Sequence, residues 1–140
     1  MSAQDPDAAR VLAPALAAAM NARDIEAFVS LFAADYESSQ PVHPDRAFQG
    51  RDQVRANWSA IFSGVPDFQA ELVATASEGD MGWSEWRWRG THEDGSHLDM
   101  AGVIIFEVRD GRIARARLYV EPVERGEGIE AAVREMSGRD

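Results

Sequence analysis

Glu121 is the residue in this sequence best suited to acid–base chemistry. It ends the last of four apolar strand patterns, in the segment Tyr119-Val120-Glu121-Pro122. A carboxyl group at the end of an apolar strand is expected to be partly desolvated, which favours its protonated form and makes proton transfer near neutral pH feasible. Glu121 is therefore the leading catalytic candidate. The alternative is a carboxylate at the rim of the fold that pairs with an arginine, such as Arg117 or Arg125, or faces solvent.

Tyr119 and His97 are the side chains that we expect to assist Glu121. Tyr119 lies two residues away on the same strand face and could donate a hydrogen bond to a ligand carbonyl, although an ordinary core tyrosine is the alternative. His97 begins another strand pattern and could stand at a pocket mouth. His92 and His97 flank one turn, but two histidines fall short of the three or four ligands of a zinc site, so we predict no metal site.

Trp86 and Trp88 form the second group of interest. Because side chains alternate in a strand, the two indoles share one face, and Glu85, Arg87 and Arg89 share the other. The indoles could line a site for a planar apolar ligand, although packing in a core or a dimer interface is the more frequent role of large aromatic residues. Further ligand contacts expected near them are Trp58, Phe62 and Met100.

Polar ligand contacts are predicted from residues 36–50. Residues 36–40 form a short strand pattern, and residues 41–50 are an irregular excursion rich in Pro, His and Asp that would overhang a pocket. We therefore predict Ser38, Gln40 and His43 as ligand contacts. The alternative for His43 is a loop histidine held by its local backbone.

The arrangement of helical and strand patterns predicts the fold that positions these residues. Three amphipathic helical patterns come first, over about 6–21, after Asp24, and from Asp52. Pro14 lies inside the first, so that helix either kinks or begins near residue 11. Strands follow over about 68–77, 81–92, 97–109 and 112–121, joined by short turns into antiparallel hairpins. We predict an α+β protein whose curved antiparallel sheet forms a cone with three helices packed on its concave face.

Residues 100–106 predict a partner chain. The run Met-Ala-Gly-Val-Ile-Ile-Phe does not alternate between apolar and polar residues, so both faces of its strand are apolar. The helices can cover only one of these faces. We therefore predict a homodimer formed through the convex side of the sheet.

Composition limits the classes of function. The 140 residues fit one domain, with a C-terminal helical tail at about 128–137. Cysteine is absent and all 14 cationic residues are arginine, which removes disulfides, thiolate chemistry and lysine Schiff bases. A formal charge of -10 disfavours nucleic acid. No apolar run approaches the roughly 20 residues of a membrane-spanning helix, so we expect a soluble cytoplasmic protein.

Several short motifs carry a family resemblance. They are Phe32-Ala33-Ala34-Asp35-Tyr36, Phe48-Gln49-Gly50-Arg51-Asp52-Gln53-Val54, Val65-Pro66-Asp67-Phe68, Arg109-Asp110-Gly111-Arg112-Ile113 and Tyr119-Val120-Glu121. With the order of helices and strands, they resemble the SnoaL-like (polyketide-cyclase-like) members of the nuclear-transport-factor-2-like superfamily over nearly all of residues 8–123. The resemblance implies a pocket between the concave sheet and the helices, with an acid or base at the position of Glu121.

Two subfamilies of the same superfamily fit this sequence poorly. By resemblance, limonene-epoxide-hydrolase-like relatives carry an Arg and an Asp where this chain has Trp86 and Trp88. Steroid-isomerase-like relatives carry an acid on the short strand, where this chain has Ser38 and Gln40. Neither mechanism is therefore expected.

Three hypotheses remain for the function. In the first, the protein is a cofactor-independent enzyme of the polyketide-cyclase or isomerase type, in which Glu121 moves a proton on a carbonyl-bearing apolar molecule oriented by Tyr119, Gln40 or His97. This hypothesis requires neither a metal nor an organic cofactor. In the second, the protein binds a small apolar ligand without transforming it. In the third, it is a dimeric scaffold whose cavity is incidental.

Overall fold

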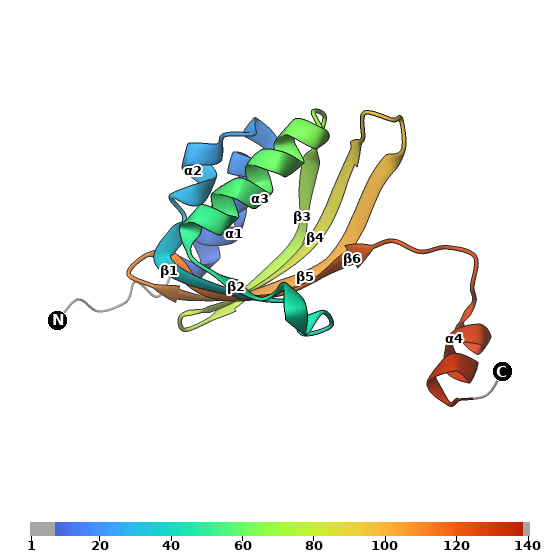
Figure 1. The fold of residues 1–140 in the computed structure, drawn as a ribbon. Helices are drawn as coiled ribbons and strands as arrows, with labels where there is room; N and C mark the ends of the chain where they lie inside the picture. The colour runs from blue at the N-terminus through green and yellow to red at the C-terminus, as the bar shows by residue number, and fades with distance from the viewer. Residues whose placement is uncertain (1–7, 139–140) are drawn as a thin grey trace.

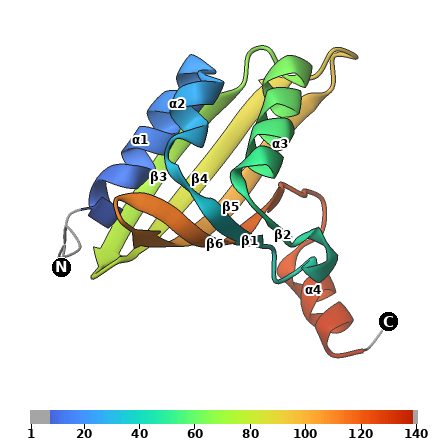
Figure 2. The ribbon, with the colours of Figure 1, turned by 60° about the vertical axis from the view of Figure 1, so that its left-hand side comes forward.

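A computed structural model describes residues 8–138 and shows three helices against one face of a curved sheet (Figure 1). The elements are α1 (Ala8–Ala22), α2 (Ile25–Val29), β1 (Phe32–Ser39), the 3-10 helix η1 (Pro44–Arg46), β2 (Phe48–Gln49), α3 (Arg51–Gly64), β3 (Gln69–Glu78), β4 (Met81–Thr91), β5 (His97–Arg109), β6 (Arg112–Pro122) and α4 (Ile129–Met136). The turned view in Figure 2 shows α1, α2 and α3 on the same side of the sheet. The predicted α+β cone is confirmed.

The strands of the described residues form one six-stranded sheet in the order β2-β1-β6-β5-β4-β3. Strands β3 to β6 are consecutive antiparallel hairpins, each within one residue of its predicted bounds. β1 pairs parallel with β6, placing Ser38 opposite Ala116, so the sheet is mixed and not wholly antiparallel as predicted. Local turn residues reveal a hairpin, whereas a parallel partner far along the chain leaves no local signal. The short strand β2 also lies in the segment predicted to be irregular.

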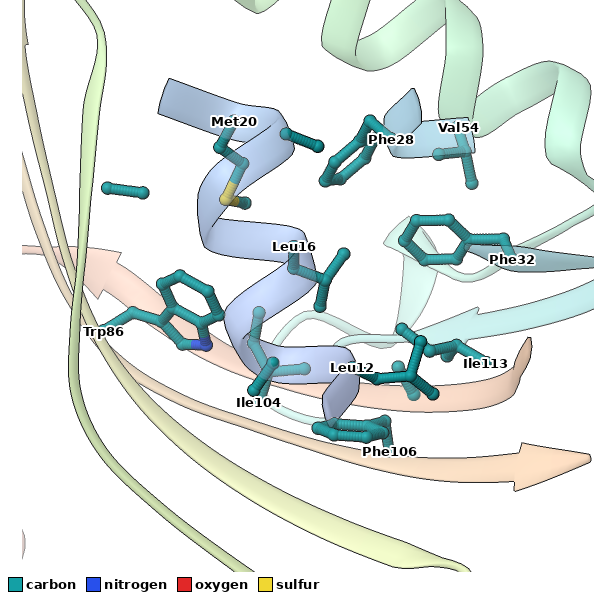
Figure 3. Close-up of a cluster of buried hydrophobic side chains, with 14 of the residues drawn as sticks. Leu12, Leu16, Met20, Phe28, Phe32, Val54, Trp86, Ile104, Phe106 and Ile113 are labelled. Atoms are coloured by element: carbon teal, nitrogen blue, oxygen red, sulfur yellow. The ribbon is translucent and has the colours of Figure 1, made fainter. Parts of the chain in front are cut away.

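Helix α1 provides the centre of the core (Figure 3). Its residues Leu12, Leu16 and Met20 recur at helical spacing and are each at most 3% exposed. The described helix begins at Ala8 and continues through Pro14, so the predicted alternative start near residue 11 is wrong. Pro14 is exposed on the outer side of the helix, away from the core. The predicted start at residue 6 lies outside the described residues.

The chain after α1 forms a short helix and then a strand. Asp24 caps α2, as predicted, by accepting a hydrogen bond from the backbone N–H of Ala27 at 3.1 Å. The helix ends before Phe32, which its apolar pattern assigns to the helix but which begins β1. The backbone N–H of Ile113 donates to the carbonyl of Leu31 at 2.8 Å and draws this segment into the sheet. Phe32 is buried in either position.

Hydrogen bonds from the end of α1 fasten this helix to β3. The side chain of Asn21 donates to the carbonyl of Ala70 at 2.9 Å and accepts from the backbone N–H of the same residue at 2.7 Å. Arg23 donates to the carbonyl of Phe68 at 2.8 Å. Since β3 is an outer strand of the sheet, these contacts satisfy backbone groups at an otherwise open edge.

The convex face of the sheet carries apolar side chains that no helix covers. In β5, Ile104 and Phe106 point to the core and are buried, whereas Val103 and Ile105 lie on the convex face and are half-buried. Trp83 of β4 pairs with Ile105 and extends this surface, with 37% of the residue exposed. Both faces of the strand through residues 100–106 are therefore apolar.

Helix α4 stands apart from the cone, beyond the end of β6 (Figure 1). It falls within the predicted tail, and its apolar residues Ile129, Val133 and Met136 are each more than half exposed. Within residues 8–138, no helix combines the length and the apolar character needed to cross a bilayer.

Gly102 provides a test of how closely β5 and β6 approach. A Cβ atom at this position would lie 2.1 Å from the carbonyl oxygen of Tyr119 and 2.6 Å from the Cα atom of Val120. Both are backbone atoms of the neighbouring strand. We predict that Gly102→Ala lowers the free energy of unfolding by roughly 2–4 kcal/mol, measured by urea denaturation. Gly64→Ala is the control, because a Cβ there meets open space; equal stability of the two variants would contradict the close approach.

Candidate functional site

A cavity of ≈ 180 Å³ lies between the concave face of the sheet and the three helices packed on it. Its lining is mostly aliphatic and aromatic and comes from α1, α2 and α3 and from β1, β2, β4, β5 and β6. Figure 3 shows part of this lining, with Leu16 of α1 facing Phe28 and Phe32. The cavity lies where the family resemblance implies a pocket, between the sheet and the helices.

Trp58 of α3 is the central aromatic residue of the cavity wall. Its ring centroid lies 5.0 Å from that of Phe28 and 5.3 Å from that of Trp88, and the two indoles meet edge to face at 84°. Phe68 completes the cluster at 5.6 Å from Trp58. These contacts join α3 to β4 along one side of the cavity. The indole nitrogen of Trp88 is buried and has no hydrogen-bond partner among the described residues.

Polar groups line the cavity from β1 and α3. Tyr36, Ser38 and Gln40 are spaced by two residues and share one face of β1 and its continuation, and Asn57 is contributed by α3. Burial raises the pKa of Tyr36 to about 12, and a hydrogen bond with Ser38 partly offsets this shift. Tyr36 is therefore a neutral phenol at physiological pH.

The two amides of this polar group have their oxygen atoms engaged. The Asn57 oxygen accepts a hydrogen bond from Gln53 Nε2 at 2.7 Å, and the Gln40 oxygen accepts one from Arg46 at 3.1 Å. Their NH2 groups remain to donate hydrogen bonds. None of the lining side chains is Asp, Glu, His or Arg, so the cavity carries no formal charge.

Four of the predicted ligand contacts line the cavity, namely Ser38, Gln40, Trp58 and Trp88. Trp86, the inward-facing neighbour of Trp88, does not line it. Trp86 is fully buried, its indole nitrogen donates to the hydroxyl of Ser84 at 2.8 Å, and it belongs to the core (Figure 3). Both indoles are packed in the hydrophobic core, and Trp88 in addition lines the cavity.

Phe62 and Met100 also lie outside the cavity lining. Phe62 is one helical turn beyond Trp58 and contacts the rings of Trp58 and Phe68 at centroid distances of 5.7 and 6.1 Å. Met100 pairs with Trp88 across the sheet but lines a hollow at the surface together with His97. Both residues support the aromatic wall from positions that the cavity does not reach.

Glu121 lies at the end of β6 and not at the cavity. Ala116 and Leu118 line the cavity, so Tyr119 and Glu121, at odd-numbered positions, belong to the convex face. The Glu121 carboxylate pairs with Nε2 of His43 at 2.8 Å, and these side chains are 37% and 35% exposed. Glu121 therefore lies at the rim of the fold, as in the alternative interpretation, but its partner is a histidine and not an arginine.

The predicted group of Glu121, Tyr119 and His97 is not brought together. Glu121 pairs with Ala101 in the sheet, and His97 lies four residues further along β5, a separation of about 13 Å at the usual rise of a strand. His97 is exposed at the start of that strand. Within residues 8–138, no three His, Asp or Glu side chains are grouped in a way that would hold a metal ion.

Tyr36 and Asn57 are cavity residues that were not predicted from the sequence. The spacing of Tyr36 and Ser38, two residues apart in a strand, contains the signal that would have found Tyr36. Asn57 is harder to assign, because its direction depends on the rotation of α3, which the sequence defines only through its apolar stripe.

A larger hollow of ≈ 580 Å³ lies at the surface where the end of α1 meets β3 and β4. Its polar lining is largely used in structural contacts, since Asn21 bonds Ala70 and Arg23 bonds Phe68. The inner cavity is the better candidate site because its polar side chains retain free donors and its walls are mostly apolar.

The comparisons with known proteins agree with this architecture. A family model described as a SnoaL-like domain matches residues 13–116. No curated protein matches the chain.

Solved structures share the fold at low sequence identity. A proposed ketosteroid isomerase from Kribbella flavida is 24% identical, with a TM-score of 0.70, over 91% of this chain and 88% of that chain. IdmH, a proposed polyketide cyclase from Streptomyces antibioticus, is 22% identical, with a TM-score of 0.70, over 80% and 91%. Rv0760c from Mycobacterium tuberculosis, in complex with estradiol-17β-hemisuccinate, is 18% identical, with a TM-score of 0.69, over 80% and 92%. At these identities the structures establish the nuclear-transport-factor-2-like fold alone.

Proposed function

The chain belongs to the SnoaL-like domain family, and from this premise we propose that its cavity binds a small, mostly apolar molecule without transforming it. The observation that carries the proposal is the composition of the cavity, with apolar and aromatic walls and a few polar groups, which is typical of small-molecule sites. Rv0760c, solved in complex with an estradiol derivative, is a case in which a similar fold holds a ring compound.

Binding is favoured over turnover because no acid or base lines the cavity. Proton transfer needs a group within about 2.6–3.2 Å of the reacting atom, or one linked to it through a water molecule. The pair formed by His43 and Glu121 lies outside the lining. Tyr36, with a pKa of about 12, is a poor proton donor near neutral pH.

A cofactor-independent enzyme of the cyclase or isomerase type is the second candidate, and the His43–Glu121 pair is the observation that favours it. A carboxylate that holds an imidazole is suited to moving protons. The backbone N–H of His43 donates to the carbonyl of Gln40 at 2.7 Å, so the loop that carries His43 begins at the cavity wall. Catalysis would require a ligand that extends from the cavity to this pair.

We also propose that two copies of the chain associate through the convex face of the sheet. Within residues 8–138, no helix covers the partly exposed apolar surface formed by Trp83, Val103 and Ile105. A second copy is the simplest cover, because the same patch then serves both subunits.

Two charged residues on this face support a symmetric pair. Glu85 of β4 and Arg117 of β6 lie on either side of β5, and neither takes part in an ion pair within the described part of the chain. A two-fold axis that runs along β5 places β4 of each copy over β6 of the other. Glu85 of one copy then faces the strand that carries Arg117 in the second copy, and the contact occurs twice.

The binding proposal predicts a response of the tryptophan fluorescence, because Trp58 and Trp88 are in the cavity wall. We expect small ring compounds to change the emission of the native protein in a saturable way. Ala116→Leu, which fills the cavity from β6, should abolish the response, whereas Ala56→Leu on the exposed face of α3 should not. A flat response of the native protein across a diverse set of compounds would rule the proposal out.

Glu121→Gln separates binding from catalysis. Because the carboxylate is outside the cavity, we expect the affinity for a bound compound to stay within about twofold and the compound to be recovered unchanged from both proteins, as followed by chromatography. Conversion by the native protein that disappears in Glu121→Gln at unchanged affinity would support the enzyme in place of the binding protein.

The dimer is tested by sedimentation equilibrium of charge-reversal variants. We expect a dimer at micromolar concentration, at least about tenfold weaker association for Glu85→Arg and for Arg117→Glu, and recovery when both changes are combined. A monomeric native protein would contradict the proposed interface, and weakening by both single changes without recovery would contradict the crossed ion pairs.

A further inference from the structure

We propose that the ligand of the cavity is a neutral compound of one ring that carries a carbonyl oxygen, with that oxygen turned to the amide groups of Gln40 and Asn57. The inference rests on the proposed binding function and adds the chemical class of the ligand. Three properties of the cavity support it, namely its volume, the hydrogen-bonding state of its polar groups and its lack of charge.

The volume limits the ligand to about one ring. A protein cavity of about 150 Å³ lined by aliphatic and aromatic residues holds a single benzene molecule. The cavity of ≈ 180 Å³ has room for one ring and a small substituent. It lies below the roughly 300–1,000 Å³ of sites for larger ligands, so a four-ring steroid does not fit without rearrangement of the walls.

The polar groups of the cavity present hydrogen-bond donors, which favours a ligand that carries an acceptor. The amide oxygen of Gln40 is taken by Arg46 and that of Asn57 by Gln53, so both amides present N–H donors. Trp88, another lining residue, has an indole N–H without an acceptor. The indole N–H of Trp88 is buried without a partner, which is destabilising by about 1–3 kcal/mol, and the half-exposed amides of Gln40 and Asn57 offer further donors to an acceptor oxygen in the cavity.

The absence of charge disfavours an ionised ligand. None of the lining residues is cationic, and Arg46, which reaches the oxygen of Gln40, approaches from outside the lining. An ionised carboxylate placed among Leu16, Ile104 and Phe106 would lose its hydration without gaining an ion pair. Among molecules of suitable size, a ketone, an aldehyde or a lactone is therefore preferred to a carboxylic acid.

Matched ligands test the assignment by isothermal titration calorimetry. Acetophenone and ethylbenzene have the same size and differ in the carbonyl group, benzoate adds a charge, and estradiol adds three rings. We expect acetophenone to bind about tenfold more tightly than ethylbenzene, a difference of about 1.4 kcal/mol. We expect no measurable binding of benzoate or estradiol.

Variants of the two amides identify the donors. Asn57→Leu and Gln40→Met should each abolish the tenfold preference for acetophenone over ethylbenzene when both compounds are measured on the same variant, and urea denaturation of each variant checks that the fold is retained. Gln49→Leu, at an exposed position of β2, should leave the preference unchanged.

The possible failures are distinguishable. Equal binding of acetophenone and ethylbenzene, or tighter binding of benzoate, would overturn the carbonyl assignment while leaving the binding function in place. Tighter binding of estradiol would overturn the size limit. If the cavity binds none of the four compounds, both the assignment and the proposed function fail.

Discussion

The edge-to-face contact between Trp58 and Trp88 is the interaction on which the rest of the site depends, because it joins helix α3 to strand β4 across the open side of the cone. Phe28 and Phe68 pack on the same indole at 5.0 and 5.6 Å and extend the contact to α2 and to the start of β3. Next to this cluster, Asn21 fixes α1 to Ala70, the residue of β3 that pairs with Trp88. The helices are thus held at a set distance from the strands, and the space left between them is the cavity.

The sequence contains most of this architecture but not all of the site. The four long strands are punctuated by Gly- and Asp-rich turns, so their hairpins were predicted within one residue. The parallel pairing of β1 with β6 joins distant segments and has no local signature. This pairing matters for function, because it places Ser38 and Gln40 beside the cavity-facing residues Ala116 and Leu118.

The position of Glu121 follows from the alternation of side chains along β6, in which even- and odd-numbered residues face opposite sides of the sheet. In residues 115–121, apolar side chains at even positions alternate with Arg115, Arg117, Tyr119 and Glu121 at odd positions. This alternation indicates that Glu121 shares the convex face with the arginines. The place of Glu121 at the end of an apolar strand, together with the family resemblance, led to the opposite expectation. The carboxylate is at the rim of the fold, bound to His43, and the cavity is left without a charged group.

We propose that a small carbonyl compound occupies the neutral, donor-lined space between the Trp58–Trp88 wall and the polar group of β1. A crystal structure with 4-bromoacetophenone is the most direct test, since the anomalous signal of bromine locates the ring without assumptions about the site. We predict one strong bromine peak inside the cavity, with the carbonyl oxygen within hydrogen-bond distance of Asn57 or Gln40. Bromine peaks confined to the surface, with the cavity unchanged, would contradict the proposed occupation of the cavity by a carbonyl compound.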